Sequence, residues 1–482
     1  MKTQHQASIS AYKADGFIGK YQRLVKDVVI PYQYSVLCDQ APDTEKSHVI
    51  SNFINAGKAL RGDQVPEDGF YGMVFQDSDA AKWIEAAAYS LSLFPDEKLE
   101  KTVDELIDII AAAQDEDGYL NTYYTIKDRD KRFTNLQEGH ELYCSGHMME
   151  ASCAYYEATG KDKLLQVMLK NMEHIYRYFI TEKHDGYPGH PEVELALLKL
   201  YRLSGNPHSL ELAEHFINIR GVDPHFYEKE KAGRDWSVWN NDPADTDYLQ
   251  ASAPVREQKD AVGHAVRAVY LYTAMADLAA STDDKELSAA CRRLWESITR
   301  RRMYLTGGIG STVIGEAFTV DYDLPNDTAY AETCAAIGLI FFGSRMLENE
   351  VDGEYGDICE RAFYNAVLAG MQLDGKRFFY VNPLEVIPGI SGAAQTHKHD
   401  LPVRPKWYAC ACCPPNVARL LSSVAEYAWH VIPGKLFSNL FIGGTLDLSD
   451  TFGGKITLKT AYPYDNKVEY HFLPKGETMT IP

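Results

Sequence analysis

The sequence predicts a mainly α-helical protein, built as an α/α toroid over roughly residues 12 to 430 and followed by a smaller β-rich module. Apolar residues recur three and four positions apart through most of the chain, as they do in helices that bury one face. Short turn-forming linkers separate these segments, and the pattern changes to strand-like alternation after His430. With 482 residues, of which 45% are apolar and 24% charged, the chain has the composition of a globular protein with a large core.

The helical segments are expected to form antiparallel pairs, because two to five turn residues and a polar cap connect one helix to the next. The clearest helical periods cover residues 79–93, 141–158, 191–203, 262–280 and 284–299. The connecting motifs are ATGKDKLL (158–165), LSGNPHSLELA (203–213) and ASTDDKELSAA (280–290). A row of such pairs hides both flanks when it closes into a ring of inner and outer helices, and an open superhelix is the competing arrangement.

The segment after His430 predicts antiparallel strands. Its motifs KLFSNLFIGGTLDLSD, GGKITLKTAY and NKVEYHFL combine alternation, β-branched residues and Gly or Asp turns. We therefore divide the chain into a barrel domain, residues 1–430, and the start of a C-terminal β-sandwich, residues 431–482. About fifty residues are few for a complete sandwich, so we expect an incomplete one and a truncated chain. The sheet edge left exposed would favour a homo-oligomer.

The charge and the N-terminus restrict the partners and the compartment. The formal net charge of −20 repels phosphate backbones and anionic membrane surfaces, which argues against nucleic acid and membranes as partners. The first residues contain no apolar core of a secretory signal, and no run reaches the roughly 18 apolar residues of a membrane helix. We expect a cytoplasmic location, where the cysteines are thiols, metal ligands or catalytic groups rather than disulfides.

The motif WYACACCPPNVARLL, residues 407–421, is the most specific stretch of the sequence. Pro414 favours an extended Cys413, and Pro415 suits the first turn of a helix. Cys412 and Cys413 are therefore expected at a helix N-terminus, where the positive end of the dipole lowers a thiol pKa.

A second motif supplies further ligands. TGGIGSTVIGEAFTVDYDLPNDTAYAETCAAIG, residues 306–338, contains Glu316, Glu332 and Cys334. Together with Cys412 and Cys413, the last two make three sulfurs and one oxygen, a set suited to tetrahedral zinc. The plainer alternative is that the cysteines only pack in a tight turn and that Glu332 complements a helix dipole.

Two other interpretations of the motifs are weaker. His140, Cys144 and His147 would share one helical face and form a rival metal site, although such histidines more often bind sugar or lie in a core. The GGIG at 307–310 lacks the order and the preceding strand of a dinucleotide fingerprint.

Several motifs together resemble glycoside hydrolase family 127, the β-L-arabinofuranosidase family. They occur in order along residues 30 to 430: QDSDAAKWIEAAAYSL (76–91), HELYCSGHMMEA (140–151), GEAFTVDYDLPND (315–327), AETCA (331–335) and CCPPN (412–416). The resemblance implies an (α/α)6 barrel followed by β-sandwich modules. It also implies hydrolysis of a small carbohydrate, a terminal β-L-arabinofuranoside, with retention of configuration.

The same resemblance assigns roles to residues of this chain. It makes Cys412 the nucleophile, Glu316 the general acid/base, and Glu332, Cys334, Cys412 and Cys413 the ligands of Zn2+. Residues that would line the subsite of the terminal sugar are His140, His190, His264, Glu360 and Tyr380. Cys410 is expected to be only a neighbour of the site.

Chemistry agrees with such a mechanism but leaves alternatives open. A thiolate is a strong nucleophile, and zinc fixes the deprotonated form that is scarce at neutral pH. The expected substrates are short plant-derived arabinooligosaccharides or glycoconjugates.

In one alternative the zinc is structural and the toroid is a non-catalytic sugar-binding module. In the other, Glu316 and Asp321 or Asp323 perform inverting hydrolysis on another pectic sugar, although these aspartates and Asp327 are more simply turn-forming acids.

Overall fold

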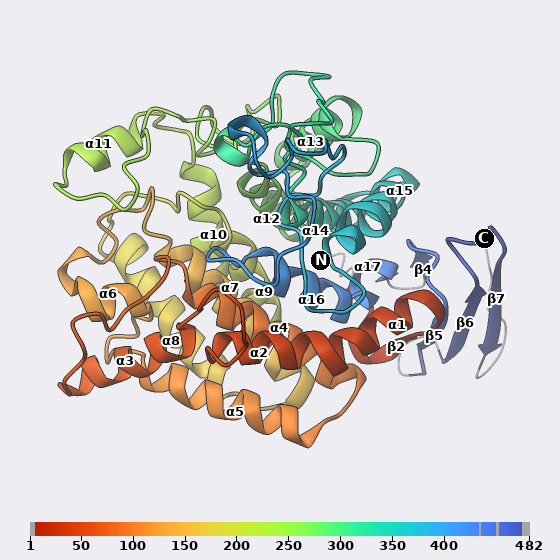
Figure 1. The fold of residues 1–482 in the computed structure, drawn as a ribbon, viewed down its shortest axis with the longest axis horizontal. Helices are drawn as coiled ribbons and strands as arrows, with labels where there is room; N and C mark the ends of the chain where they lie inside the picture. Colours follow the sequence, from red (N-terminus) through yellow and green to blue (C-terminus); the bar gives the residue numbers. More distant parts are fainter. Residues whose placement is uncertain (1–4, 433–434, 450–452, 475–482) are drawn as a thin grey trace.

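The inner layer of the fold consists of helices that are buried on nearly all sides (Figure 1). The structure, a computed structural model, describes residues 5–432, 435–449 and 453–474. Helix α4 illustrates the inner layer, because every residue from Asp77 to Leu91 is buried. The inner helices are α4 (Asp77–Leu93), α7 (Glu141–Thr159), α9 (Val193–Ser204), α12 (Ala265–Thr282), α14 (Thr333–Asn349) and α16 (Cys413–Ser422).

The outer helices are amphipathic and bury one face against the inner layer. In α5, for example, Val103, Leu106, Ile107 and Ile110 are buried at helical spacing. The outer helices are α1 (Gly16–Leu24) with α2 (Ile30–Leu37), α5 (Glu97–Ala112), α8 (Lys163–Tyr176), α10 (Pro207–Ile219), α13 (Lys285–Ser297) and α15 (Gly353–Arg361). Several contain or end in a π-helical turn: η2 (Val25–Val29), η4 (Arg177–Thr181), η5 (Ile298–Arg302) and η7 (Ala362–Val367). The remaining helices are α3 (Val49–Arg61), α6 (Thr122–Lys127), α11 (Phe226–Ala232) and α17 (Ala425–Ala428).

The inner helices close into a ring. Contacts run from α4 to α7, α9, α12, α14 and α16, and then from α16 back to α4. The last contact joins segments more than 300 residues apart and excludes the open superhelix. The (α/α)6 toroid predicted from the sequence is confirmed. None of the described helices is long and apolar enough to cross a membrane.

Two antiparallel sheets adjoin the helical body, and both contain residues from the beginning of the chain. One sheet has the order β1-β3-β4, and the other has the order β2-β5-β6-β7. Strand β1 pairs Gln6 with His430, and strand β2 pairs Tyr12 with Leu446. The strands are β1 (His5–Gln6), β2 (Tyr12–Ala14), β3 (Trp429–Ile432), β4 (Lys435–Ser438), β5 (Gly444–Asp447), β6 (Gly454–Thr460) and β7 (Val468–Pro474).

The sheets lie at one edge of the toroid, beside α1 (Figure 1). The buried Tyr12 of β2 connects the two sheets: its hydroxyl donates to the Ile442 carbonyl, just before β5, and its ring contacts Trp429 of β3 edge to face. The C-terminal strands follow the sequence prediction, whereas the two N-terminal strands were not anticipated. The domain boundary at residues 430 and 431 stays a prediction.

Candidate active site

The predicted site residues gather where inner helices begin. His140, His264, Glu332 and Cys412 are the N-caps of α7, α12, α14 and α16, and His190 lies just before α9. A ring of parallel helix starts places unpaired amides and positive dipole ends around one pocket. The helix starts by themselves favour carboxylates and thiolates over their protonated forms, and burial acts in the opposite direction.

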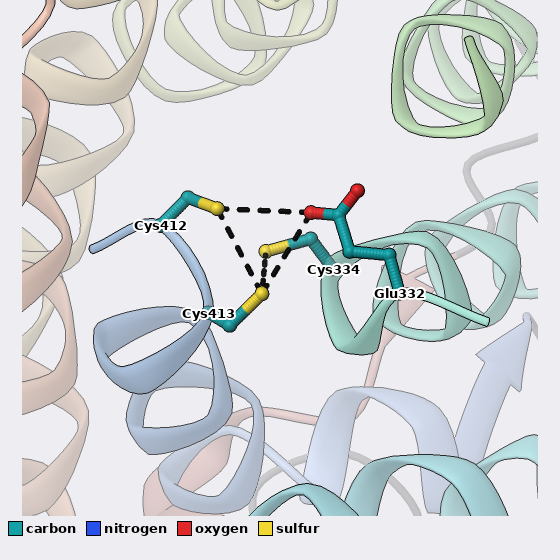
Figure 2. Close-up of side chains that lie close together, drawn as sticks. All are labelled: Glu332, Cys334, Cys412 and Cys413. Carbon is teal, nitrogen blue, oxygen red and sulfur yellow. Dashed lines mark hydrogen bonds between the residues drawn. The ribbon is translucent and has the colours of Figure 1, made fainter. Parts of the chain in front are cut away.

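The three thiols and the carboxylate of the predicted zinc set face one another across α14 and α16 (Figure 2). The sulfur of Cys413 lies 3.2 Å from that of Cys334 and 3.7 Å from that of Cys412. Oε1 of Glu332 lies 3.6 Å from the Cys412 sulfur and 3.7 Å from the Cys413 sulfur. All four ligand atoms lie within 4.8 Å of one another.

This geometry fits a zinc ion. In a tetrahedral site with zinc–sulfur bonds near 2.3 Å, the donor atoms lie about 3.8 Å apart, close to the separations found here. Oε2 of Glu332 is buried without a hydrogen-bond partner. Burial, followed by the charge of Cys412, raises the pKa of Glu332, and burial and the neighbouring thiols raise that of Cys413. A divalent cation would reverse this repulsion among buried anions.

Glu316 occupies a strained position beside the cluster. It follows Gly315 in a short helical turn, and both residues have positive φ, 69° and 52° respectively. A non-glycine residue in this region costs of order 1 kcal/mol or more, and such strain is concentrated at functional sites. The carboxylate accepts hydrogen bonds from Tyr330 at 2.8 Å and Tyr380 at 3.4 Å. Burial would raise the pKa of Glu316, but His264 and the two hydroxyls together hold it below its ordinary value.

His264 has a tautomer that its neighbours determine. Its Nδ1 accepts from the backbone N–H groups of Val266 and Arg267, at 3.1 and 3.3 Å, and so caps α12. The proton therefore resides on Nε2, which lies 3.0 Å from Oε2 of Glu316 and donates to it. One imidazole thus begins an inner helix and orients the carboxylate.

His140 and His190 present the opposite arrangement. Nδ1 of His140 bonds to the carbonyl of Glu138, and Nδ1 of His190 lies 2.9 Å from the carbonyl of Pro191. A carbonyl only accepts, so each Nδ1 carries the proton and each Nε2 is an acceptor. Burial lowers the pKa of His140 to about 3 and that of His190 well below its ordinary range, so both are neutral. Their rings lie 5.7 Å apart, and they can accept hydrogen bonds from sugar hydroxyls.

A cavity of about 260 Å³ opens beside Glu316. Tyr330, Tyr380 and Cys410 line it near the carboxylate, and Lys398 and His399 line it on the loop after η9 (Gln395–His397). Tyr380 is held in place by Tyr408, whose hydroxyl accepts from its backbone N–H at 3.0 Å. Cys410 lies 3.9 Å from the Tyr380 hydroxyl, as expected for a neighbour of the site.

Glu360 is not brought to this group. It lies near the end of α15, where its carboxylate accepts from the Tyr462 hydroxyl at 2.7 Å and from the Phe441 N–H at 3.2 Å. Both partners belong to the C-terminal module, so the carboxylate connects the barrel to that module. We therefore leave Glu360 out of the sugar subsite.

The rival site interpretations fare differently from the zinc set. Among the described residues, His140, Cys144 and His147 form no joint group of metal donors, because His147 lies 3.0 Å from Glu192 instead. Asp321 pairs with Arg302 at 2.8 Å rather than facing Glu316, which agrees with a structural acid.

Tyr330 was missed by the sequence analysis, although this residue lies two positions before Glu332 in a motif already singled out. Lys398, which lines the cavity, carries no signal in the sequence.

Known proteins are similar to this chain over most of its length. Residues 13–426 match the family described as β-L-arabinofuranosidase, GH127 catalytic domain. A non-reducing end β-L-arabinofuranosidase of Bifidobacterium longum subsp. longum is 41% identical over 472 residues, which are 92% of this chain and 70% of the relative.

Solved structures agree. A GH127 β-L-arabinofuranosidase from Geobacillus stearothermophilus T6 superposes with a TM-score of 0.90 at 49% identity, covering 96% of this chain and 73% of that one. A second GH127 β-arabinofuranosidase gives a TM-score of 0.83 at 34% identity, with coverages of 97% and 69%. The resemblance stated from the motifs is confirmed: the chain belongs to the GH127 β-L-arabinofuranosidase family and is a glycoside hydrolase.

Proposed function

We propose that the protein is a retaining exo-acting hydrolase that releases terminal β-L-arabinofuranose from short plant-derived arabinooligosaccharides or glycoconjugates. The sugar is proposed from the relatives named above, and the roles of Cys412 and Glu316 are proposed from the site. The observation that carries the proposal is exposure: among the four clustered donors, Cys412 alone is partly exposed, whereas Glu332, Cys334 and Cys413 are buried. We infer that a bound sugar approaches Cys412 rather than the two buried cysteines.

In the proposed first step, the Cys412 sulfur attacks the anomeric carbon and the bond to the leaving oxygen breaks. Glu316 gives its proton to that oxygen. Because the pKa of Glu316 is low in the free protein, we expect the bound sugar to raise it by excluding water. In the second step, water attacks the same carbon, Glu316 accepts its proton, and the carbon–sulfur bond breaks. Two displacements restore the original configuration.

Glu332, Cys334, Cys412 and Cys413 would hold Zn2+, which when bound favours the thiolate form of the cysteines. The neutral His140 and His190 would accept hydrogen bonds from the hydroxyls of the sugar. His264 and Tyr380 would orient the Glu316 carboxylate toward the leaving oxygen.

The test is hydrolysis of p-nitrophenyl β-L-arabinofuranoside by the zinc-loaded protein in buffer with methanol, followed by proton NMR. Methyl β-L-arabinofuranoside as the first transfer product supports retention, and an α-configured first product would favour the inverting carboxylate pair. We expect Cys412→Ser to abolish turnover and Glu316→Gln to keep slow reaction with leaving groups that need no proton. Wild-type activity of Cys412→Ser would exclude the cysteine nucleophile.

A further inference from the structure

An exposed indole contacts His140, one of the predicted sugar-binding residues. The indole of Trp239 is 40% exposed and lies 5.5 Å from the ring of His140, almost perpendicular to it at 87°. Phe75 contacts both rings, at 6.0 Å from Trp239 and 5.0 Å from His140. Large aromatic side chains that stay exposed beside a binding site are typical contact surfaces for ligands.

The segment that carries Trp239 is fixed by a buried carboxylate. Glu138, which is 0% exposed, accepts hydrogen bonds from the Ser237 hydroxyl at 2.6 Å and from the backbone N–H groups of Val238 and Asn241, both at 2.7 Å. Burial would raise the pKa of Glu138, but these donors, with the amide of Asn135, lower it to about 2. The carboxylate is therefore ionised and clamps residues 237–241 from within.

A second carboxylate, in α11, links these two stretches through a third segment. Glu230 accepts from the backbone N–H groups of Leu136 and Gln137, at 2.6 and 3.3 Å. Lys231 donates to the carbonyl of Asn241 at 2.9 Å. Helix α11 is thus bonded both to the stretch before α7 and to the stretch around Trp239. A side chain held in place before binding loses little conformational entropy when a ligand arrives.

The position of Trp239 in a series of side-chain contacts that begins at Glu316 indicates which part of the sugar it faces. Contacts run from Glu316 to His264, from His264 to His190 at 5.6 Å, and from His190 to His140. The leaving group must lie at the Glu316 end, because Glu316 protonates its oxygen in the proposed mechanism. Trp239 lies at the other end of this series, beyond His140, where the far side of the terminal sugar would lie.

We propose that Trp239, backed by Phe75 and positioned by Glu138, is the end wall of the sugar pocket, which contacts the apolar face of the terminal sugar and excludes chains that continue beyond it. The inference rests on the proposed function and extends it, since it names the residue that restricts the enzyme to terminal sugars. Trp239 acts by direct contact with the sugar, and Glu138 is a positioning residue that acts through Trp239.

The experiment compares Trp239→Ala, Trp239→Phe and Glu138→Gln with the wild type, and with Tyr464→Ala as a control that removes an exposed aromatic ring outside the pocket. Kinetics are measured on p-nitrophenyl β-L-arabinofuranoside and on the same glycoside extended by one more sugar at its distal end. We expect Trp239→Ala to raise KM about tenfold with a smaller change in kcat. The preference of Trp239→Ala for the unextended substrate over the extended one should fall at least tenfold. In Trp239→Phe, most of the wild-type KM and most of the wild-type preference should be retained.

We expect Glu138→Gln to shift KM and preference in the same direction as Trp239→Ala. Unchanged KM and unchanged preference in Trp239→Ala, with a normal melting curve, would overturn the proposal. Tryptophan fluorescence during titration with L-arabinose reads the contact without turnover, and the quench seen in wild type should disappear in Trp239→Phe. If the wild type shows this quench with L-arabinose but hydrolyses neither substrate, the proposed function is contradicted and the role of Trp239 as the end wall is supported. A quench that persists in Trp239→Phe would contradict that role.

Discussion

His264 performs two tasks with its two ring nitrogens, and a substitution can separate them. Nδ1 caps α12, and Nε2 donates to Glu316. Asn is a good N-cap residue, whereas Ala leaves the cap unmade at a cost of about 1 kcal/mol. We predict that His264→Asn keeps the melting temperature close to wild type and loses activity, and that His264→Ala loses both. Retained activity in His264→Asn would show that its contact with Glu316 is dispensable.

Lys398 is the residue of the cavity for which a role with the leaving group can be tested most directly. It is exposed, lines the cavity that contains Glu316, and belongs to the loop after η9. An ammonium group there can donate hydrogen bonds to an oxygen-rich leaving group. We predict that Lys398→Ala lowers kcat/KM several-fold for a disaccharide substrate. The kcat/KM for methyl β-L-arabinofuranoside should not change, because its methyl group is too short to reach the Lys398 ammonium group. Lys376→Ala, an exposed lysine outside the cavity, is the matched control, and equal losses on both substrates would contradict the role.

At the scale of elements, close contact between two inner helices determines where His190 lies. A Cβ at Gly146 of α7 would stand 2.8 Å from the Cα and the N of Val193, at the start of α9. Backbone atoms cannot give way as a side chain can, so Gly146→Ala must push the start of α9 outward. We predict a loss of about 1–3 kcal/mol in the free energy of unfolding, as for other overpacked cores, with a raised KM. Urea unfolding and kinetics check this, with Gly353→Ala, where a Cβ meets nothing within 4 Å, as the control.

The elements also show what the sequence could predict. Helix periods and the CCPPN and ETC motifs are local, so the helical pairs, Cys412, Cys413, Cys334 and Glu332 could be found from neighbouring residues. Strand β2 could not be found, because the pairing of Tyr12 with Leu446 joins opposite ends of the chain. The place of Glu360 depends on the module against which α15 packs, and Trp239 depends on a clamp made by Glu138, about a hundred residues away.

Across the whole molecule, charges buried inside the toroid hold the ring together. Arg419 of α16 lies 2.7 Å from both Glu85 of α4 and Glu150 of α7, and it is 2% exposed. It therefore joins the last inner helix to the first two and closes the ring electrostatically. Removing one partner of a buried ion pair costs about 3–5 kcal/mol because the other charge stays unpaired. We predict a loss of this order for Arg419→Leu in urea unfolding, and Arg23→Leu, in the last turn of α1, should change little.

Buried carboxyl groups should make stability fall as the pH rises from about 4 to about 8. Burial raises the pKa of Glu141 to about 8, and those of Asp79, Glu230 and Glu426 to about 7. The folded state then binds more protons than the unfolded state, whose carboxyls titrate near 4, so stability is lost as the pH rises through these values. Buried histidines have lowered pKa values and oppose this trend only below about pH 6.5, where unfolded histidine becomes protonated.

The histidines no longer oppose the carboxyls between pH 6.5 and 8, and Glu141 provides the sharpest test in this window. Its carboxyl accepts from the Tyr119 hydroxyl and the Phe133 N–H, contacts that a neutral amide of the same shape can largely keep. We predict that the free energy of unfolding of Glu141→Gln rises relative to that of the wild type by about 1.4 kcal/mol per pH unit across this window. This is the change expected when the folded state binds one proton more than the unfolded state. Urea midpoints at constant free zinc measure this, and Glu97→Gln on the exposed first turn of α5 is the control. A difference between Glu141→Gln and wild type that does not vary with pH would mean that Glu141 is already ionised in the folded protein at pH 6.5.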